Sequence, residues 1–196
     1  VMSDGKLILN GAYFMMDWND FQSTTYNLDY STVSFVDNVG NAEINGLELD
    51  ATYKASDTLT VSAYMVKNDP SLSQDYYDVS GLLQANAGNR LAYVPELSYV
   101  LGLDKELMIG GSPAYLSLDY SYTGDRYTSQ ANELTLPSYA IANMRMGREV
   151  GNRSIELYMT NITDEDGYLS RYNDFNAIRK TQNKPRVIGL RFRYRY

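Results

Sequence analysis

Acidic side chains are the residues of this sequence that come closest to a pattern with chemistry. The stretch Asp164-Glu165-Asp166-Gly167 places three carboxylates within four residues, and hard oxygen ligands of this kind suit Ca²⁺. The full loop pattern of a calcium site is missing, so a solvated loop is the favoured interpretation. Other carboxylates show no spacing that brings two of them to one cleft, as glycoside hydrolysis requires.

Nucleophilic and transition-metal chemistry is limited by composition. The 196 residues include no His and no Cys, which removes the commonest general base and the thiolate ligand. Classical catalytic triads are therefore absent. We predict that the protein is not an enzyme and uses no metal or cofactor. The net charge of −7 argues against a nucleic-acid partner, because phosphate binding favours a basic surface.

Tyrosine is the unusual component, with 19 Tyr against 5 Phe and 1 Trp. Tyr suits surfaces that are apolar on one side and wet on the other, such as membrane interfaces or ligand-binding walls. We predict an interfacial girdle from five tyrosines in strands: Tyr99, Tyr120, Tyr122, Tyr194 and Tyr196. Five more fall in polar connections and either contact a ringed solute, pack within their loops or contact lipopolysaccharide: Tyr76, Tyr77, Tyr127, Tyr168 and Tyr172.

The elements that position these residues are β-strands. In the last stretch, Ile188, Leu190 and Phe192 alternate with basic residues, and a period of two places the two sets on opposite sides of a sheet. The same alternation runs through 47–54, 59–65, 97–104, 114–122, 140–146 and 155–159. Residues 7–18 are apolar on both faces over part of their length, so their register is uncertain. We predict about eight antiparallel strands, most near the roughly 9–11 residues that cross a bilayer.

The connections between these strands alternate in length. Short links at 55–57, 109–112 and 150–152 alternate with long polar ones at about 67–90, 124–137 and 162–184. Pro113, Pro137 and Pro185 lie at strand starts and Pro70 just past a strand end, where no ladder N–H is needed. Only Pro95 lies near a strand body, close to a loop. Short turns at one end and long loops at the other are typical of outer-membrane barrels.

The polar face of the predicted strands carries charge. In a membrane barrel such a face lines the lumen and the apolar face contacts lipid, whereas a soluble sheet tolerates it as solvent surface. The arginines either line the solute path, pair with carboxylates such as Asp119, or sit in water near the rim. The candidate lumen-facing residues are Arg145, Arg191, Arg193, Arg195, Asp119 and Glu48.

Several stretches resemble TonB-dependent outer-membrane receptors. Asn45-Gly46-Leu47-Glu48-Leu49, after Asn38-Val39-Gly40-Asn41-Ala42, is similar to the family's N-x-G-x-A-x-x-x-G-x-E stretch. Gly88-Asn89-Arg90-Leu91 with Val94-Pro95 resembles its G-N-R-L…P stretch at the start of a strand. Tyr120-Ser121-Tyr122-Thr123-Gly124 and Leu136-Pro137-Ser138-Tyr139 resemble the next hairpin. Asn161-Ile162-Thr163-Asp164 resembles the N-L-F-D corner, with Ile and Thr in place of Leu and Phe. Pro185 through Tyr196 resembles the closing strand and its assembly signal, with a terminal Tyr where Phe is commoner.

The resemblance spans residues 17–196, and each stretch is weak alone. It implies a transmembrane barrel of about 22 strands with a plugged lumen, of which this chain, residues 1–196, would be the C-terminal part without the plug domain. It also implies a Gram-negative outer-membrane location and uptake of a scarce nutrient such as a ferric siderophore, cobalamin or an oligosaccharide. The implied partners are the remaining barrel and plug, the TonB complex, outer-membrane lipid and lipopolysaccharide, and a small-molecule substrate. The plug would give the lumen-facing arginines a further contact.

Two other architectures remain open at this point. A self-contained eight-stranded outer-membrane barrel would have a structural or adhesive role, with side chains filling its interior. A soluble β-sandwich, such as a carbohydrate-binding module or an enzyme built on one, would be extractable without detergent. The first residues show no signal peptide, so we expect the start to be a processed end or a boundary within a longer protein. The sequence does not identify the substrate.

Overall fold

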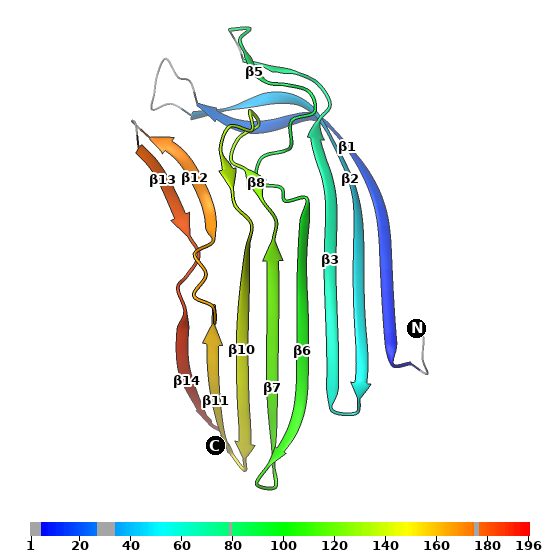
Figure 1. Ribbon diagram of the computed structural model, residues 1–196, viewed down its shortest axis with the longest axis vertical. Helices are drawn as coiled ribbons and strands as arrows, with labels where there is room; N and C mark the ends of the chain where they lie inside the picture. The colour runs from blue at the N-terminus through cyan, green and yellow to red at the C-terminus, as the bar shows by residue number, and fades with distance from the viewer. Residues whose placement is uncertain (1–4, 27–33, 79, 175–176) are drawn as a thin grey trace.

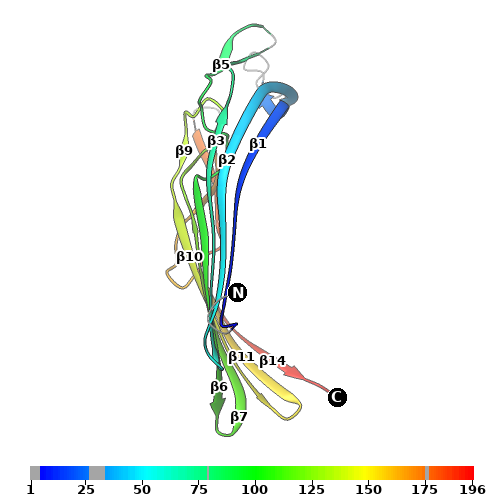
Figure 2. The same cartoon turned by 90° about the vertical axis from the view of Figure 1, so that its right-hand side faces the viewer.

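The fold of the chain is that of a single curved sheet with small hairpins at one end (Figures 1 and 2). The computed structural model describes residues 5–26, 34–78, 80–174 and 177–196. All regular secondary structure in these ranges is β-strand. Within the same ranges, no helix has the length and apolar character needed to cross a membrane.

The main sheet contains eight antiparallel strands, as the alternation predicted. Each strand pairs with the next main strand along the chain, so the sheet is a meander whose edges are the first and last strands. In order across the sheet they are β1 (Leu7–Tyr26), β2 (Ser34–Ser56), β3 (Leu59–Leu72), β6 (Leu97–Ile109), β7 (Ser112–Thr123), β10 (Tyr139–Val150), β11 (Arg153–Thr160) and β14 (Val187–Tyr194).

The two ends of the main sheet differ. At the turn end, short links join β2 to β3, β6 to β7 and β10 to β11, and Gly110, Gly111 and Gly151 take the left-handed backbone that tight hairpin turns require. At the loop end, the long polar connections fold into hairpins, which the sequence did not predict. These are β4 (Tyr76–Tyr77) with β5 (Leu83–Ala85), β8 (Arg126–Tyr127) with β9 (Thr135–Leu136), and β12 (Tyr168–Asp174) with β13 (Ala177–Gln182).

Cross-strand register gives the main sheet two chemically distinct faces. Residues that pair across an antiparallel ladder point to the same side. One chain of pairs runs Leu103↔Leu118↔Met144↔Met159↔Ile188, from β6 to β14; this side is called the apolar face. The neighbouring chain of pairs, Gly102↔Asp119↔Asn143, lies on the opposite side, called the polar face.

β1 and β2 are longer than the predicted membrane-crossing length, at 20 and 23 residues. Their pairing is regular from Leu7↔Tyr53 to Trp18↔Ala42, which settles the register that the sequence left uncertain. A bulge follows between Trp18 and Phe21, where Asp20 has a φ of 52°. Beyond this bulge the pair bends across the loop end of the sheet (Figure 1).

The prediction that Pro70 lies just past a strand end was wrong. Pro70 lies inside β3 and pairs with Ile44 of β2. The N–H groups of Asn68 and Leu72 point away from β2, to the carbonyls of Glu96 and Asn89. The nitrogen of Pro70 points the same way, so the ladder with β2 does not need the N–H that proline lacks.

The buried core sits at the loop end, where β2 and β3 of the main sheet meet the β4–β5 hairpin. It consists of Val39, Ala42, Leu72, Tyr76, Ala85 and Leu91, with Phe21, Ile44 and Val94 packed against it. Apolar side chains on the main sheet are instead exposed, up to 74% for Met15 and 72% for Phe192. Within the described ranges, large apolar side chains are therefore exposed on the main sheet, whereas the loop end encloses a small core.

Candidate functional site

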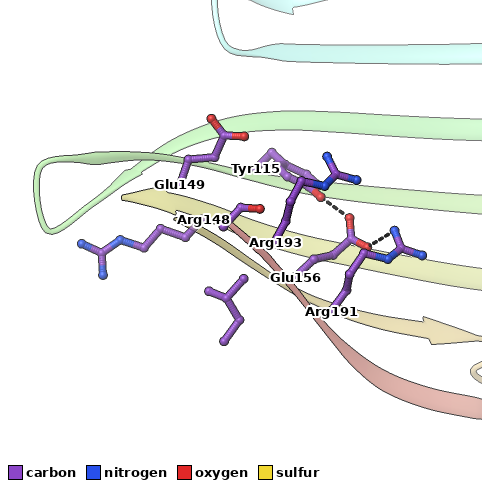
Figure 3. Close-up of a pocket in the computed structure, with 8 residues that line it drawn as sticks. Tyr115, Arg148, Glu149, Glu156, Arg191 and Arg193 are labelled. Carbon is purple, nitrogen blue, oxygen red and sulfur yellow. Dashed lines mark hydrogen bonds and ion pairs between the residues drawn. The ribbon is translucent and has the colours of Figure 1, made fainter. Parts of the chain in front are cut away.

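Polar and charged side chains from three strands meet on the polar face near the turn end (Figure 3). The Tyr115 hydroxyl of β7 donates to one carboxylate oxygen of Glu156 on β11, and Arg191 Nη1 of β14 donates to the other at 2.8 Å. The Arg191 guanidinium also lies 5.7 Å from the ring centre of Tyr158. This cluster, called the Glu156 cluster, joins β7, β11 and β14 of the main sheet.

A small hollow adjoins the Glu156 cluster. Its volume is about 70 Å³, and Arg148, Glu149, Ser154 and Arg193 are among the residues that line it. Small-molecule sites are usually several hundred Å³. The hollow is therefore too small to enclose a typical small-molecule ligand.

The predicted lumen-facing residues share the polar face. The register places Arg145, Arg191, Arg193, Asp119 and Glu48 there. Arg195 follows β14, and its N–H donates to the Asn152 carbonyl at 2.9 Å. Asp119 accepts a hydrogen bond of 2.5 Å from Asn143 Nδ2. The structure thus gives Arg191 the carboxylate of Glu156 as its partner, which the sequence did not single out.

Aromatic rings cover glycines in the neighbouring strand at three places on the polar face. Tyr115 lies over Gly147, Tyr158 over Gly189 and Phe14 over Gly46, each ring opposite its paired glycine. A Cβ added to any of the three glycines would approach ring carbons to 2.2–2.4 Å. A ring lying flat on a glycine shields its backbone and fixes the register. This arrangement holds Tyr115 in place for Glu156.

Arg90 joins two long connections at the loop end. Its guanidinium contacts Asp125 Oδ2 at 2.9 Å and Glu96 Oε1 at 3.1 Å, and it lies 5.2 Å from the ring centre of Tyr127. Its backbone N–H donates to Asn132 Oδ1 at 2.8 Å, and Asn132 Nδ2 donates back to the Arg90 carbonyl at 2.9 Å. The segment before β6 is thereby fastened to the β8–β9 hairpin.

Asn161 organises the corner between β11 and β14. Its side chain is buried, and its Nδ2 donates to the carbonyls of Glu165 at 3.0 Å and Lys184 at 3.1 Å, while Oδ1 accepts the Glu165 N–H at 2.8 Å. Asp164 Oδ1 accepts the Arg186 N–H at 2.7 Å. The acidic stretch considered for calcium therefore serves the corner. No group of three or more acidic side chains is arranged for a metal ion within the described ranges.

Comparison with known protein families identifies the family to which this sheet belongs. A family model described as TonB dependent receptor-like, beta-barrel matches residues 2–162. The chain belongs to the TonB-dependent receptor family. The predicted family is thus confirmed, and the main sheet corresponds to part of the receptor barrel.

Solved receptor structures share the fold. The ferric yersiniabactin uptake receptor FyuA from Yersinia pestis matches with a TM-score of 0.79 at 18% identity, over 97% of this chain and 28% of that one. The siderophore receptor PiuA from Acinetobacter baumannii matches with a TM-score of 0.77 at 21% identity, over 100% and 27%. The FrpB iron transporter (F3-3 variant) from Neisseria meningitidis gives 0.67 at 18% identity, over 98% and 29%. The chain spans less than a third of the length of each, and the likeness shows the fold.

The tyrosines predicted as a girdle form two groups on the receptor sheet. Tyr99 stacks on Tyr120 and Tyr122, with ring centres 6.2 and 5.0 Å apart, near the loop end. Tyr194 and Tyr196 meet edge to face at 5.2 Å at the turn end. All four strand positions share the apolar face. Their role as interfacial anchors stays a prediction.

The tyrosines predicted to contact substrate lie in different surroundings at the loop end of the receptor. Tyr76 is buried, and its hydroxyl donates to Asp37 Oδ2 at 3.0 Å. Tyr127 lies against Arg90, and Lys180 Nζ lies 4.5 Å from the ring centre of Tyr168 and donates to its hydroxyl at 2.9 Å. Tyr77 and Tyr172 are each 52% exposed. Substrate contact stays a prediction for all five, and the last two have the most surface to offer.

Replacing Arg90 by lysine should loosen the β8–β9 hairpin of the receptor by about 1 kcal/mol. Lysine keeps the charge but loses the planar fork that reaches Glu96 and Asp125 together, and exposed partners limit the loss. Hydrogen exchange of the Tyr93 N–H, which donates to the Tyr127 carbonyl, would report the change. Arg171→Lys is the matched control, because Arg171 reaches Thr135 through one long contact. Equal exchange in both variants would contradict the role of Arg90.

Asp78 gives the β4–β5 hairpin a dependence on pH. The Leu82 N–H and the Ser80 hydroxyl donate to Asp78 and hold the pKa of this carboxyl below its ordinary value. The stability that the Asp78 carboxylate gives the hairpin is therefore fully present above the ordinary pKa, and it is lost as the pH falls through the lowered pKa. Below about pH 4, we expect the Leu82 N–H to exchange faster, after correction for intrinsic rates. Asp78→Asn should abolish this pH step, and a step that persists in the variant would assign it elsewhere.

Sequence reasoning missed Tyr115, Glu156, Asn132 and Asp78 as residues that organise the receptor. Glu156 and Tyr115 were visible only as members of alternating strands, and their pairing needs the register of three strands. Asn132 has a φ of 59°, and an Asn in a polar connection is a usable signal for a left-handed turn position. Asn161 entered only through the resemblance of its stretch to the family corner.

Proposed function

We propose that this chain forms part of the wall of an outer-membrane receptor that takes up a scarce nutrient with energy from TonB. The observation that carries the proposal is the division of the main sheet into an apolar and a charged face, in a chain that matches the family's barrel model. In a bilayer, a closed sheet satisfies its backbone, turns its apolar face to lipid and lines its lumen with polar groups.

The orientation of the barrel follows from its two ends. Outer-membrane barrels place short turns in the periplasm and long loops outside the cell. The turn end, with Gly110, Gly111 and Gly151, would then face the periplasm. The loop end, with its three hairpins and buried core, would face the exterior, next to lipopolysaccharide, and would meet the substrate first.

Ferric chelates are the first substrate class to test. The names of similar structures refer to ferric yersiniabactin, a siderophore and iron, which supports this class without assigning it to this chain. Exposed aromatic side chains such as Tyr77 and Tyr172 suit flat or ringed chelates. The plug domain and the TonB complex are the further partners that we propose for the complete receptor.

Uptake by the full-length receptor tests the proposal. Cells that carry the receptor as their only route for a radiolabelled ferric siderophore should show saturable uptake, and deletion of TonB should abolish it. A panel of ferric siderophores, cobalamin and an oligosaccharide would identify the class. Uptake that continues without TonB would contradict the energised mechanism, and recovery of the receptor outside the outer-membrane fraction would contradict the location.

Cysteine labelling tests which face lines the lumen. We expect Arg193→Cys, on the polar face, to react with a water-soluble maleimide in the full-length receptor, because lumen groups are hydrated. Phe192→Cys, its neighbour on the apolar face, should react at least about tenfold more slowly, because thiolates form poorly in an apolar environment. Removal of the plug should speed labelling at position 193 if the plug covers it. The reverse order of reactivity would contradict the assignment of the faces.

A self-contained small barrel is the second candidate. Its support is the strand number, since eight strands suffice to close a barrel filled by side chains. In such a barrel β1 would pair with β14. Among the described residues, these strands are the opposite edges of the sheet instead, so the larger receptor is the better-supported proposal.

A further inference from the structure

The apolar face carries a row of basic residues at the turn end. We infer that Lys105, Arg148 and Arg153 bind the phosphate of an anionic phospholipid in the periplasmic leaflet. The inference rests on the proposed membrane orientation and adds a binding site on the outside of the barrel wall. The three residues lie on the lipid-facing side of the sheet, and Arg148 also borders the hollow beside the Glu156 cluster.

The acidic side chains of the apolar face are confined to its loop end. Within the described strands, the acidic side chains that the regular pairing places on the apolar face lie at the loop end. They are Asp17 and Glu43, which pair with one another, and Asp69. At the turn end its charged residues are all basic: Lys105, Arg148 and Arg153. No carboxylate on this face therefore stands beside the basic row to neutralise it.

The basic row steps across the sheet at the angle of a membrane surface. Lys105 pairs with Leu116, which pairs with Met146, so Arg148 lies two residues closer to the turn end. Arg148 pairs with Ile155, and Arg153 lies two residues closer again. Four residues at about 3.3 Å over three strand spacings of about 4.8 Å give a slope of about 40°. Barrel strands tilt by about 35–45°, so the row would lie level in the bilayer.

The apolar residues between the basic row and the loop end form a band. The loop-end boundary of this band runs parallel to the basic row. On β3, Asp69 lies two residues closer to the turn end than Ser71, the partner of Glu43. Tyr99 pairs with Met65, which lies four residues closer to the turn end than Asp69. On β3, ten residues separate Asp69 from Leu59, which pairs with Lys105. At about 3.3 Å per residue and a tilt of about 40°, the band is about 25 Å high, the height of a barrel's apolar belt.

The side chains of the row bend away from the apolar band. Lys105 Nζ donates to Thr58 Oγ1 at 2.7 Å in the β2–β3 turn, and Arg148 Nη2 donates to the Gly110 carbonyl at 3.4 Å in the β6–β7 turn. Figure 3 shows Arg148 directed away from Tyr115, Glu156 and Arg191. Long basic side chains do this where an apolar surface meets headgroups. Arg148 Nε is buried and makes no hydrogen bond to the described residues.

Arg148 and Arg153 have the spacing of a phosphate clamp. They are diagonal neighbours on paired strands, for which Cβ atoms are about 7–8 Å apart. Guanidinium groups bind phosphate oxygens in a bidentate manner, and two of them at this spacing reach one phosphate from either side. Tyr194 pairs with Arg153 and supplies the aromatic surface typical of the headgroup level. Lys105 extends the positive row along the leaflet.

Native mass spectrometry of the full-length receptor in detergent would test this site. The probes are phosphatidylglycerol and phosphatidylcholine with identical acyl chains, supplied as an equal mixture. We expect the wild-type receptor to retain phosphatidylglycerol preferentially. The double variant R148Q/R153Q should lose about tenfold or more of this preference, because each charge-assisted contact contributes about a tenfold factor. Arg153→Gln alone, at an exposed position, gives a second reading if the double variant folds poorly.

Lys67→Gln is the matched control, because Lys67 is a basic residue of the same face at the loop end. Its lipid preference should equal that of the wild type. A wild-type receptor without preference, a double variant that keeps it, or displacement of phosphatidylglycerol by lipopolysaccharide would each overturn the site. Such failures would leave uptake and outer-membrane location unchanged, whereas failure of the proposed function would appear as loss of both in the wild type.

Discussion

Replacing Asn161 by alanine should destabilise the receptor by about 3 kcal/mol or more. The buried side chain satisfies three backbone groups, namely the Glu165 N–H and the carbonyls of Glu165 and Lys184. An unpaired buried group costs about 1–3 kcal/mol. The residue also has a φ of 50°, where alanine costs about 1 kcal/mol more than asparagine. Urea unfolding of the full-length receptor in micelles, followed by gel mobility without heating, would measure the loss.

Two further variants separate these contributions. Asn161→Gly keeps access to the left-handed backbone and loses all three hydrogen bonds, so it should be almost as unstable as the alanine variant. Asn161→Asp keeps the acceptor for the Glu165 N–H but turns a buried carboxylate oxygen toward the carbonyls of Glu165 and Lys184, so at neutral pH it should be at least as unstable as the alanine variant. Wild-type stability in Asn161→Ala would show that the corner is held by other contacts.

Gly46→Val should destabilise the receptor by about 1–3 kcal/mol through overpacking. The Phe14 ring lies on Gly46, and an added Cβ would lie 2.2 Å from its Cζ. The ring must leave its site or β1 must separate from β2. The same unfolding assay would measure the change, and a shift of β1 pairing would also appear as faster hydrogen exchange in this strand.

The partner and a matched position provide the controls for Gly46→Val. Phe14→Ala removes the ring and should rescue much of the loss in the double variant, a coupling expected only for residues in contact. Ala12 lies on β1 with Phe14, on the same face and at an exposed position, so Ala12→Val should have little effect. Equal destabilisation at positions 12 and 46 would mean that the ring is not the cause.

The sequence predicted the parts of the fold that alternate. A period of two is visible only where one side of a strand meets an apolar medium, as in Leu116 and Leu118 beside Ser117 and Asp119. Beyond that region the loop-end strands pack against segments that are distant in the sequence, so burial there does not follow a period of two. The extra length of β2, the hairpins at the loop end and the placement of Pro70 inside β3 were therefore not predictable.

The candidate sites show the same division. The faces of Arg191, Arg193 and Asp119 follow from parity and were predicted. The pairing of Arg191 with Glu156 spans 35 residues, and that of Arg90 with Asn132 spans 42. Such pairs depend on which strands are neighbours and on their register. The burial of Tyr76 likewise needs the surrounding core, because its neighbour Tyr77 has the same residue type and is exposed.

The core at the loop end distinguishes the residues that stabilise this end of the receptor from those that lie only on its surface. Val39, Leu72, Tyr76 and Leu91 are each exposed by 5% or less, whereas Tyr77 and Leu82 are exposed by 52% and 62%. Exposed loop tips tolerate substitution, whereas changes at buried positions leave cavities. We therefore expect natural variants of this receptor to differ in surface identity while keeping one external framework.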